Sequence, residues 1–570
     1  RPGVVSRTSG GIIPVCCLTR SDTGCDARLT QQAPARGDRD TYLQGAFTLA
    51  AAAMFSRILG VVYRIPLGRV MGDYGMGLFG AGYTIYMPIL GISTAGINVA
   101  ISKVMAEKIA RSDERGAYRA FRISLALLAV VGLVSAIVLG LGAHAIADRV
   151  MGNPDAYYAI LALAPAIFLV AIEGSLRGYF QGYQRMTPPA ISQVIEQLFR
   201  VVSVLILAFA LLPRGNAIAA GGAAFGATVG AVFGSLYLVI PYYLSRRDIG
   251  QRVAAAPPPA PDAESARSIV RRIVLLAVPI SIAAVVVPLF GVADLIVVPL
   301  RLQAIGFSVK DSTRLFGQLS QMAMVLINLP AVVTYGLQTS LVPAISEAQA
   351  LGDRAGIRSK TSSGLRATFL IALPAMVGLW LLATPICELL YRHGEAGVPL
   401  AALSGAVLFL MVQQTTSGVL QGLGRTDLPV RNLIIGALVK GVLAWVLTGI
   451  PELNIRGAAY STTAGFLVAS VLNVYEVYRH VGFKVDLPAT VLKPLGASAA
   501  MGLVLFFGFP RLLLALGNDV ATLALVAGGG LVYVATLLLL GGIRERDFAF
   551  LPVIGARLAR LFKDLGLVRE

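Results

Sequence analysis

Two arginines, Arg57 and Arg64, lie in the first long apolar segment of the chain, which reads MFSRILGVVYRIPLGRVMGD from Met54 to Asp73. An arginine near the centre of a bilayer costs about 2.5–3.5 kcal/mol even on insertion-based scales. At about 100° per residue, the two side chains fall within about 40° of one helix face. That face must therefore meet a carboxylate, a water-filled cavity or an anionic ligand.

Two structural explanations compete with a ligand. Both arginines could pair with acidic groups on neighbouring helices, or their side chains could reach the membrane interface. For Arg64 the interface is favoured by Pro66 and Gly68, which indicate that the helix ends there.

The composition sets the class of protein. Of the 570 residues, 56% are hydrophobic and only 14% are charged, and the mean hydropathy is +0.75. Apolar runs recur along the whole chain, which is typical of an all-α polytopic membrane protein. The net charge of +18 therefore indicates cytoplasmic loops that face anionic lipid, and not a nucleic-acid surface. The spacing of the four cysteines and three histidines predicts neither a metal site nor a disulfide framework.

Fourteen membrane spans are predicted. They run at about 43–67, 77–102, 120–146, 157–180, 189–212, 218–244, 273–299, 315–345, 367–390, 399–421, 430–450, 456–478, 489–509 and 519–542. With the N-terminus inside, the cytoplasmic loops hold 23 Lys and Arg residues and the external loops hold 9. This bias predicts that both termini are cytoplasmic.

The spans define the predicted domains. Residues 1–42 read as a disordered tail, 43–244 as an N-lobe, 245–272 as a Pro-Ala-rich cytoplasmic linker, 273–478 as a C-lobe and 479–542 as two extra spans. Residues 543–570 place apolar side chains opposite Arg557, Arg560 and Lys563, which predicts a basic amphipathic helix on the inner leaflet. A partner-binding helix is the alternative for this last segment.

The two lobes repeat in sequence. QGYQRMTPP, which begins at Gln181, recurs 240 residues later as QGLGRTDLP, and the same register pairs Arg200 with Lys440. Two further matches set Ala223, Ala224, Thr228 and Gly230 against Ala458, Ala459, Thr463 and Gly465, and Ala100-Ile101-Ser102 against Ala344-Ile345-Ser346. Both halves begin inside, so they are parallel repeats, which typically enclose a midplane site and rock around it. Prolines concentrated in the seventh and eighth spans are candidate bends of a moving gate.

Other charged residues fall within predicted spans. Glu173 lies in the fourth, and Glu196 and Arg200 lie four residues apart in the fifth, where they can meet on one face. Either the pair neutralises itself, or Glu173 or Glu196 is the partner of Arg57 in the absence of substrate. Asp294 in the seventh span is a candidate for coupling transport to a cation, with a helix cap or a lone ion-pair partner as the alternative.

The segment GAFTLAAAAMFSRILGVVYRIPLGRVMGDYGMG, followed by STAGINVAISKVMAE, resembles the opening of the sporulation stage V protein B and lipid II flippase branch. That branch belongs to the multidrug/oligosaccharidyl-lipid/polysaccharide (MOP) exporter superfamily. The similarity runs from about residue 43 to 542. It implies two six-helix lobes of the MATE type, a V-shaped central cavity and movement of undecaprenyl-diphosphate-linked sugars across a bacterial cell membrane.

The resemblance also implies roles for particular residues. In relatives, first-span arginines line the cavity, and Ser56 and Arg57 fall on the SR-x-L-G pattern, while Arg64 matches the second position approximately. Asp73 resembles an acidic residue of the first external loop. Asn432 in the eleventh span falls where some relatives place a sodium site, and the last two spans correspond to a groove for the polyprenyl tail.

The sequence departs from the family in one respect. Better-known flippases carry further cavity arginines in the second and eighth spans, but the predicted spans 77–102 and 315–345 contain none. Lipid II and a related lipid-linked glycan of the envelope are therefore equally open as substrates.

The resulting prediction is a monomeric flippase for a polyprenyl-diphosphate-linked glycan. It needs no cofactor, and Na⁺ or H⁺ is the candidate coupling ion. A cation-coupled multidrug exporter is the alternative within the superfamily, but two arginines disfavour cationic drugs. A non-transporting scaffold in sporulation or wall assembly is the alternative from another class. A membrane enzyme is disfavoured because the longest internal loop is the Pro-Ala linker, and no Walker motif predicts ATP hydrolysis.

Overall fold

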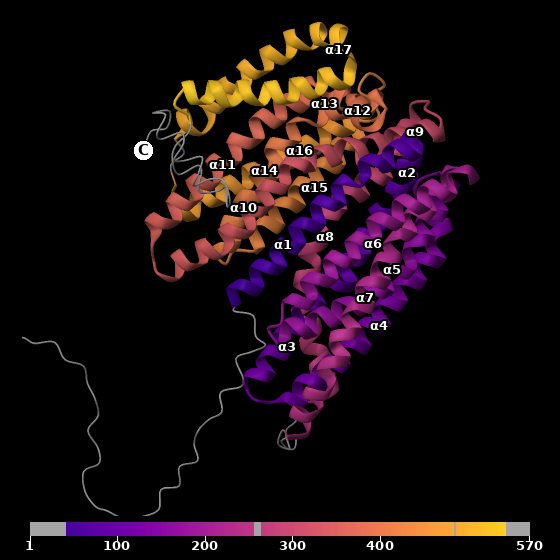
Figure 1. Ribbon diagram of the computed structural model, residues 1–570, viewed down its shortest axis with the longest axis vertical. Coiled ribbons are helices and arrows are strands. Elements are labelled where there is room, and N and C mark those ends of the chain that lie inside the picture. The colour runs from indigo at the N-terminus through magenta and orange to yellow at the C-terminus, as the bar shows by residue number, and fades with distance from the viewer. Residues whose placement is uncertain (1–41, 256–263, 484–485, 543–570) are drawn as a thin grey trace, which may run out of the picture. The chain divides into compact units, whose positions relative to one another are not determined.

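The apolar segments fold as long helices (Figure 1). The computed structural model describes residues 42–255, 264–483 and 486–542, and every regular element within these ranges is helical. The first half, here called the N-lobe, comprises α1 (Tyr42–Val62), α2 (Arg64–Leu90), α3 (Gly96–Ala110), α4 (Glu114–Ala145), α5 (Tyr157–Gly182), α6 (Thr187–Leu211) and α7 (Asn216–Ala255).

The second half has two more α-helices than the first. The C-lobe comprises α8 (Ala266–Ala304), α9 (Val309–Gly317), α10 (Met324–Ala350), α11 (Arg354–Leu381), α12 (Ala383–Tyr391), α13 (Gly397–Leu403), α14 (Gly405–Gly422), α15 (Asp427–Leu447) and α16 (Asn454–Val481). α17 (Lys493–Leu539) follows it. Two π-helical segments, η1 (Gly91–Ala95) and η5 (Gln318–Ala323), join α2 to α3 and α9 to α10.

The sequence predicted that the first helix ends near Pro66 or Gly68, and this prediction is wrong. The Tyr63 amide donates to the Leu59 carbonyl at 3.1 Å, so the backbone stays helical from α1 into α2. Pro66 causes no break because it lies in the first turn of α2, where a missing N–H costs little. The chain breaks instead at Gly72, whose φ of +66° favours a residue without a side chain.

The structure does not confirm the predicted count of fourteen spans. Over the described residues, eleven helical stretches are long and apolar enough to cross a membrane, and a bent pair, Gly394–Leu403 with Gly405–Gly422, would add a twelfth. Two of the eleven, Phe47–Ala110 and Pro488–Leu539, have 64 and 52 residues. A span needs only about 20 residues. Each of the two also contains a glycine with positive φ, Gly72 and Gly517, so a count of fourteen stays a prediction.

Helices extend further into the predicted linker than expected. α7 continues to Ala255 and α8 begins at Ala266, so much of the predicted 245–272 connector is helical. Its proline-rich centre lies in 256–263, outside the described residues. The predicted N-terminal tail and the predicted basic amphipathic helix at 543–570 also lie outside them.

The predicted repeat is visible in the backbone. Three of the five N-lobe positions with a positive φ have a C-lobe counterpart with a positive φ 240 residues later: Ser112 and Gly352 (60° and 68°), Gly152 and Arg392 (62° and 60°), and Gln184 and Gly424 (58° and 76°). The caps follow the same register, because Asp113 accepts from the Gly116 amide and Asp353 from the Gly356 amide. The two lobes therefore share one backbone plan.

One of the three sequence matches used the wrong register. A Cβ built at Gly178 would lie 3.0 Å from the Asn98 carbonyl oxygen, and one at Gly418 would lie 3.0 Å from that of Gln338. These contacts relate the second and eighth spans by 240 residues. The match of Ala100–Ser102 to Ala344–Ser346 requires 244 and is wrong by about one helical turn. Small apolar residues recur often enough to produce such a match by coincidence.

α17 folds back on itself at Gly517, as Figure 1 shows for the yellow helices. Lys493 near its start donates to the Gly541 carbonyl beyond its end at 2.9 Å. Tyr533 donates to the Leu370 carbonyl of α11 at 2.8 Å, which attaches the hairpin to the C-lobe.

Candidate functional site

The face of α1 that carries Arg57 meets the C-lobe. The Arg57 guanidinium carbon lies 3.6 Å from the centre of the Tyr335 ring of α10, a cation–π contact. The neighbouring Ser56 is buried, and its hydroxyl donates to the Gln193 carbonyl of α6 at 3.4 Å. The helix therefore packs Ser56 into the N-lobe and directs Arg57 towards the other lobe.

Arg64 is half-buried at the start of α2. One turn further along, α2 packs on Tyr391 of α12, because a Cβ at Gly68 would lie 2.7 Å from the Tyr391 ring. The Arg64 Nε is buried and has no hydrogen-bond partner in the part of the chain that the structure describes. Buried polar atoms without partners are uncommon in proteins and call for an explanation.

Neither of these arginines forms an ion pair within the described residues. The alternative in which both are neutralised by carboxylates of neighbouring helices is therefore not what the structure shows. Arg57 is exposed on the protein surface and contacts an aromatic ring, while Arg64 is partly buried.

Glu196 and Arg200 pair on one helix face as predicted, and Glu173 joins them through a fourth residue, Arg177. The Arg177 Nη2 lies 2.6 Å from Glu173 Oε1 and 2.8 Å from Glu196 Oε2, and its Nε donates to the Ser192 hydroxyl at 3.0 Å. Arg200 completes the cluster by pairing with Glu196. We call Glu173, Arg177, Glu196 and Arg200 the N-lobe quartet, which holds two acids and two bases.

The quartet overturns one prediction. Neither Glu173 nor Glu196 is the partner of Arg57, because Arg177 and Arg200 already neutralise both carboxylates. Sequence reasoning overlooked Arg177, although its position four residues after Glu173 is the spacing that pairs side chains on one helix face.

Asp73 joins the two lobes. It is buried at 5% exposure, and its carboxylate accepts from Arg314 Nε at 3.2 and 3.1 Å and from Gln318 Nε2 at 2.9 Å. Arg314 belongs to α9 and Gln318 to η5, whereas Asp73 belongs to α2. A Cβ at Gly317 would lie only 2.3 Å from the Asp73 carbonyl oxygen, so the two backbones are in direct contact. We call Asp73, Arg314 and Gln318 the outer latch.

The predicted lack of an arginine in the eighth span was a boundary error. That helical stretch runs from Val309 to Ala350, so it begins before the predicted residue 315 and includes Arg314. Ser308 shows the correct start, because its hydroxyl caps the helix by accepting from the Asp311 amide at 3.1 Å. Arg69 was likewise missed, and its Nε donates to the Leu390 carbonyl at the end of α12 at 2.6 Å.

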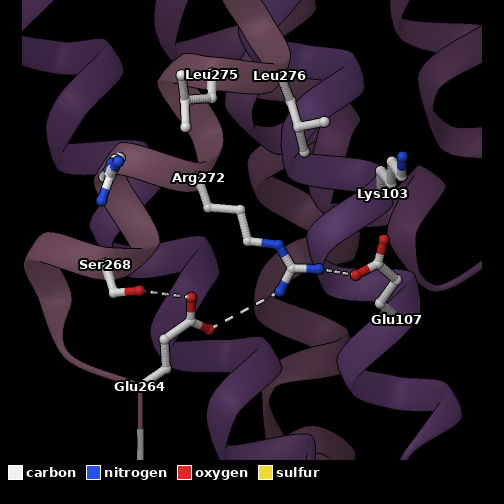
Figure 2. A pocket seen from close by; sticks show the side chains of 8 residues that line it. Lys103, Glu107, Glu264, Ser268, Arg272, Leu275 and Leu276 are labelled. Carbon is white, nitrogen blue, oxygen red and sulfur yellow. Dashed lines mark hydrogen bonds and ion pairs between the residues drawn. The ribbon is translucent and has the colours of Figure 1, made fainter.

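A second set of ion pairs joins α8 to the N-lobe near the C-terminal end of α3. Figure 2 shows Arg272 of α8 between Glu107 of α3 and Glu264. Lys108 lies 3.2 Å from Glu264. These groups border a pocket of about 390 Å³, whose lining includes Lys103 and Arg271. The Arg272 and Glu107 side chains are 37% and 35% exposed, so solvent screens this contact more than it screens Asp73.

Asp294 and Asn432, the predicted ion site, have separate partners. Asp294 Oδ2 lies 2.7 Å from the Lys440 ammonium, and both side chains are buried. Asn432 donates to Asn473 of α16 at 2.9 Å. Lys440 follows Asn432 by eight residues on α15, which is about 12 Å along a helix. The structure does not bring Asp294 and Asn432 together.

Known proteins resemble the chain over most of its length. Stage V sporulation protein B of Bacillus subtilis (strain 168) is 28% identical over 530 residues, which cover 92% of this chain and 100% of that protein. Lipid II flippase MurJ of the same organism is 29% identical over 485 residues, or 81% of this chain and 87% of that protein.

Two solved structures share the fold. The inward closed conformation of lipid II flippase MurJ covers 86% of this chain with a TM-score of 0.63 and 17% identity. An inward-facing MATE family transporter of the MOP superfamily covers 77% with a TM-score of 0.62 and 17% identity. The MatE family model matches residues 320–446.

The N-lobe and the start of the C-lobe carry the family assignment. The family model for polysaccharide biosynthesis proteins matches residues 42–349, more than half of the chain. The chain therefore belongs to the polysaccharide biosynthesis protein family.

Proposed function

We propose that this protein is a flippase that moves a polyprenyl-diphosphate-linked saccharide from the inner to the outer leaflet by alternating access of its two lobes. One observation carries the proposal. Arg57 and Arg64 keep their positive charge free of carboxylate partners among the described residues, while Arg177, Arg200 and Arg314 are each neutralised by an acid.

The chemistry of a diphosphate fits the two free arginines. A guanidinium offers planar, fork-shaped N–H donors that match pairs of phosphate oxygens, and such charge-assisted bonds are the strong ones. Arg57 contacts the Tyr335 ring without an acid partner, so in this proposal its N–H groups bind an anion. The buried, unpartnered Nε of Arg64 is a second donor for the same ligand.

The positions of the arginines suit a site that both lobes share. Arg57 reaches Tyr335 of α10, and one turn after Arg64 the helix packs on Tyr391 of α12 at Gly68, so this face of α1 and α2 meets the C-lobe. The outer latch lies further along α2, at Asp73. In this proposal the diphosphate binds below the latch, and opening of the latch lets the sugar head group leave on the outer side.

The sequence adds predictions on the direction of transport, the binding of the polyprenyl tail and the sugar head group. The loop-charge bias predicts that both termini are cytoplasmic, and a role in envelope assembly implies transport from inside to outside. The uncharged interior of the α17 hairpin suits the polyprenyl tail. Two head groups stay open in this proposal, that of lipid II and that of a related glycan. One relative is named as a lipid II flippase and another as a sporulation protein.

The test uses Arg57→Lys and Arg57→Ala in cells depleted of their lipid II flippase, together with flipping of a labelled lipid-linked sugar by the purified protein. Lysine keeps the charge but loses the bidentate geometry, and alanine loses both. Activity should fall in the order wild type, lysine, alanine, with a smaller series at Arg64.

Arg301→Ala is the matched control. Arg301 also stacks on an aromatic ring, at 4.9 Å from the centre of Trp445, but it lies on the C-lobe and donates to a backbone carbonyl. Its loss should leave flipping nearly unchanged. Normal membrane abundance with lost flipping in Arg57→Ala supports the proposal, whereas full activity of that variant refutes it. Export of cationic drugs without flipping would favour the multidrug exporter.

A further inference from the structure

The C-lobe contains a buried lysine, Lys440, that the proposed transport chemistry does not use. Its ammonium is bound on two sides, by Asp294 Oδ2 at 2.7 Å and by the Phe290 carbonyl oxygen at 2.8 Å. The Phe290 ring centre lies 5.1 Å away and closes a third side. Lys440 is 0% exposed and Asp294 is 6% exposed. A charge this far from solvent needs a specific partner.

The neighbouring helices leave little spare room. A Cβ at Gly465 of α16 would lie 2.9 Å from the Lys440 Cβ and 3.2 Å from the Phe290 ring. The Phe290 and Phe466 rings stack at 5.0 Å. The pair is therefore enclosed by α8, α15 and α16.

The internal repeat explains why Lys440 reaches across to α8. In the N-lobe, the equivalent Arg200 pairs with Glu196, four residues earlier on its own helix. The residue four positions before Lys440 is Gly436, which has no side chain to offer. Lys440 therefore takes its carboxylate from another helix, and Asp294 is the acid that α8 presents to it.

This arrangement does not fit a sodium ion at Asp294. A bare alkali cation needs several oxygen ligands, and the two oxygens on this side of the site, Asp294 Oδ2 and the Phe290 carbonyl, already hold the ammonium. Asp294 Oδ1 is buried and has no partner among the described residues. A sodium ion on that one oxygen would be repelled by the adjacent ammonium. Asn432, the other predicted ligand, is bonded to Asn473 instead.

We infer that the Lys440 ammonium is a built-in cation that takes the place of a coupling sodium ion at Asp294, so that the C-lobe of this chain works without binding sodium there. The ammonium has the charge of the ion and binds the oxygens that an ion would bind. Because it is covalently attached, it neither enters nor leaves during transport.

Thermal unfolding of the purified full chain tests the inference, in sodium chloride and in choline chloride at equal ionic strength. Wild-type protein should unfold at the same temperature in both salts. Lys440→Ala should unfold several degrees lower in choline, because Asp294 is stranded without a counter-charge. Sodium should then raise its unfolding temperature, because the vacated oxygens can bind the ion.

Two further variants keep the test decisive. Asp294→Asn combined with Lys440→Met removes both charges, so it should fold even where Lys440→Ala does not, and it should show no sodium response. Lys360→Ala is the matched control, because Lys360 also donates to a backbone carbonyl, that of Ala344 at 2.8 Å, but has no carboxylate partner among the described residues. It should show no sodium response either.

The inference is overturned if sodium stabilises the wild-type protein and Asp294→Asn abolishes that response. It is also overturned if Lys440→Ala folds and unfolds at the same temperature in both salts. Because these measurements detect ion binding through unfolding, they do not depend on which substrate the protein moves.

Discussion

The two lobes solve the same packing problem with different polar groups. The N-lobe positions 173, 177, 192, 196 and 200 carry Glu, Arg, Ser, Glu and Arg, whereas the positions 240 residues later carry Gln413, Ser417, Asn432, Gly436 and Lys440. The N-lobe neutralises four charges within one quartet. The equivalent C-lobe residues form an uncharged network apart from Lys440, which pairs with Asp294. This network borders one further ion pair, because Arg431, which pairs with Glu476, also donates to Asn432.

The uncharged network uses the same geometry. Gln413 donates to the Ser417 hydroxyl at 3.1 Å, as Arg177 bonds to Glu173 on the other lobe. Asn473 of α16 donates to the same hydroxyl at 3.0 Å, and Asn432 donates to Asn473 at 2.9 Å. One backbone plan therefore accepts either a charged or a neutral set, provided that each buried group finds a partner.

The comparison sets Arg57 and Arg64 apart from the charges inside the lobes. The quartet and Lys440 are each paired with opposite charge, whereas Arg57 and Arg64 have no acid partner among the described residues.

The largest expected effect comes from breaking the N-lobe quartet. Arg177→Met would strand Glu173 and leave Glu196 with Arg200 alone, and stranding a buried charge costs about 3–5 kcal/mol. The C-lobe equivalent, Ser417→Ala, removes neutral hydrogen bonds and should cost about 1 kcal/mol. Thermal unfolding of the two purified variants gives the comparison. Equal losses in the two lobes would contradict the distinction between charged and neutral sets.

The contacts between the lobes should differ in strength as well. Asp73→Asn keeps the size of the side chain but weakens bonds to a charged partner, worth about 1.5–3 kcal/mol each. Glu107→Gln breaks the more exposed pair with Arg272 and should cost no more than about 1 kcal/mol. The same unfolding assay measures both. A larger loss in Glu107→Gln would show that the outer latch is not the stronger contact.

The sequence predicted the class of fold and the repeat well, because apolar length and loop charge are local signals. It placed α9 too late because Leu315 begins the apolar run, whereas the helix starts at the polar cap of Ser308. It also misjudged Pro66, since a proline in the first turn of a helix does not stop it.

The candidate site was predicted only in part. The pairing of Glu196 with Arg200 follows from spacing along one helix, so it could be read from the sequence. Contacts between distant segments could not. Nothing in the sequence places Tyr335 over Arg57, or Arg314 against Asp73, because those pairs depend on how the two lobes meet.

A steric prediction tests the shared backbone plan. A Cβ at Gly230 would lie 2.6 Å from the Glu196 carbonyl oxygen, and one at Gly465 would lie 2.9 Å from that of Gly436. Gly230→Ala and Gly465→Ala should each destabilise the protein by about 1–3 kcal/mol, because backbone atoms must move. Gly441→Ala, with open space around it, is the control and should be neutral or stabilising. A loss in one lobe only would show that the repeat is not structurally equivalent there.

The smallest net effect is expected when the N-lobe is given the residues of the C-lobe. Glu173→Gln alone leaves Arg177 with Glu196 only, and Arg177→Ser alone strands Glu173, so each single change should destabilise the protein. Together they remove one acid and one base, leave the Glu196–Arg200 pair intact and reproduce the neutral bond between Gln413 and Ser417. Replacing both members of a buried pair is often close to neutral, so the double variant should unfold within about 1 kcal/mol of wild type. A double-mutant cycle isolates the coupling between the two positions. If the losses simply add, the quartet is not a neutralised unit, and Glu173 returns as a residue whose charge serves the substrate.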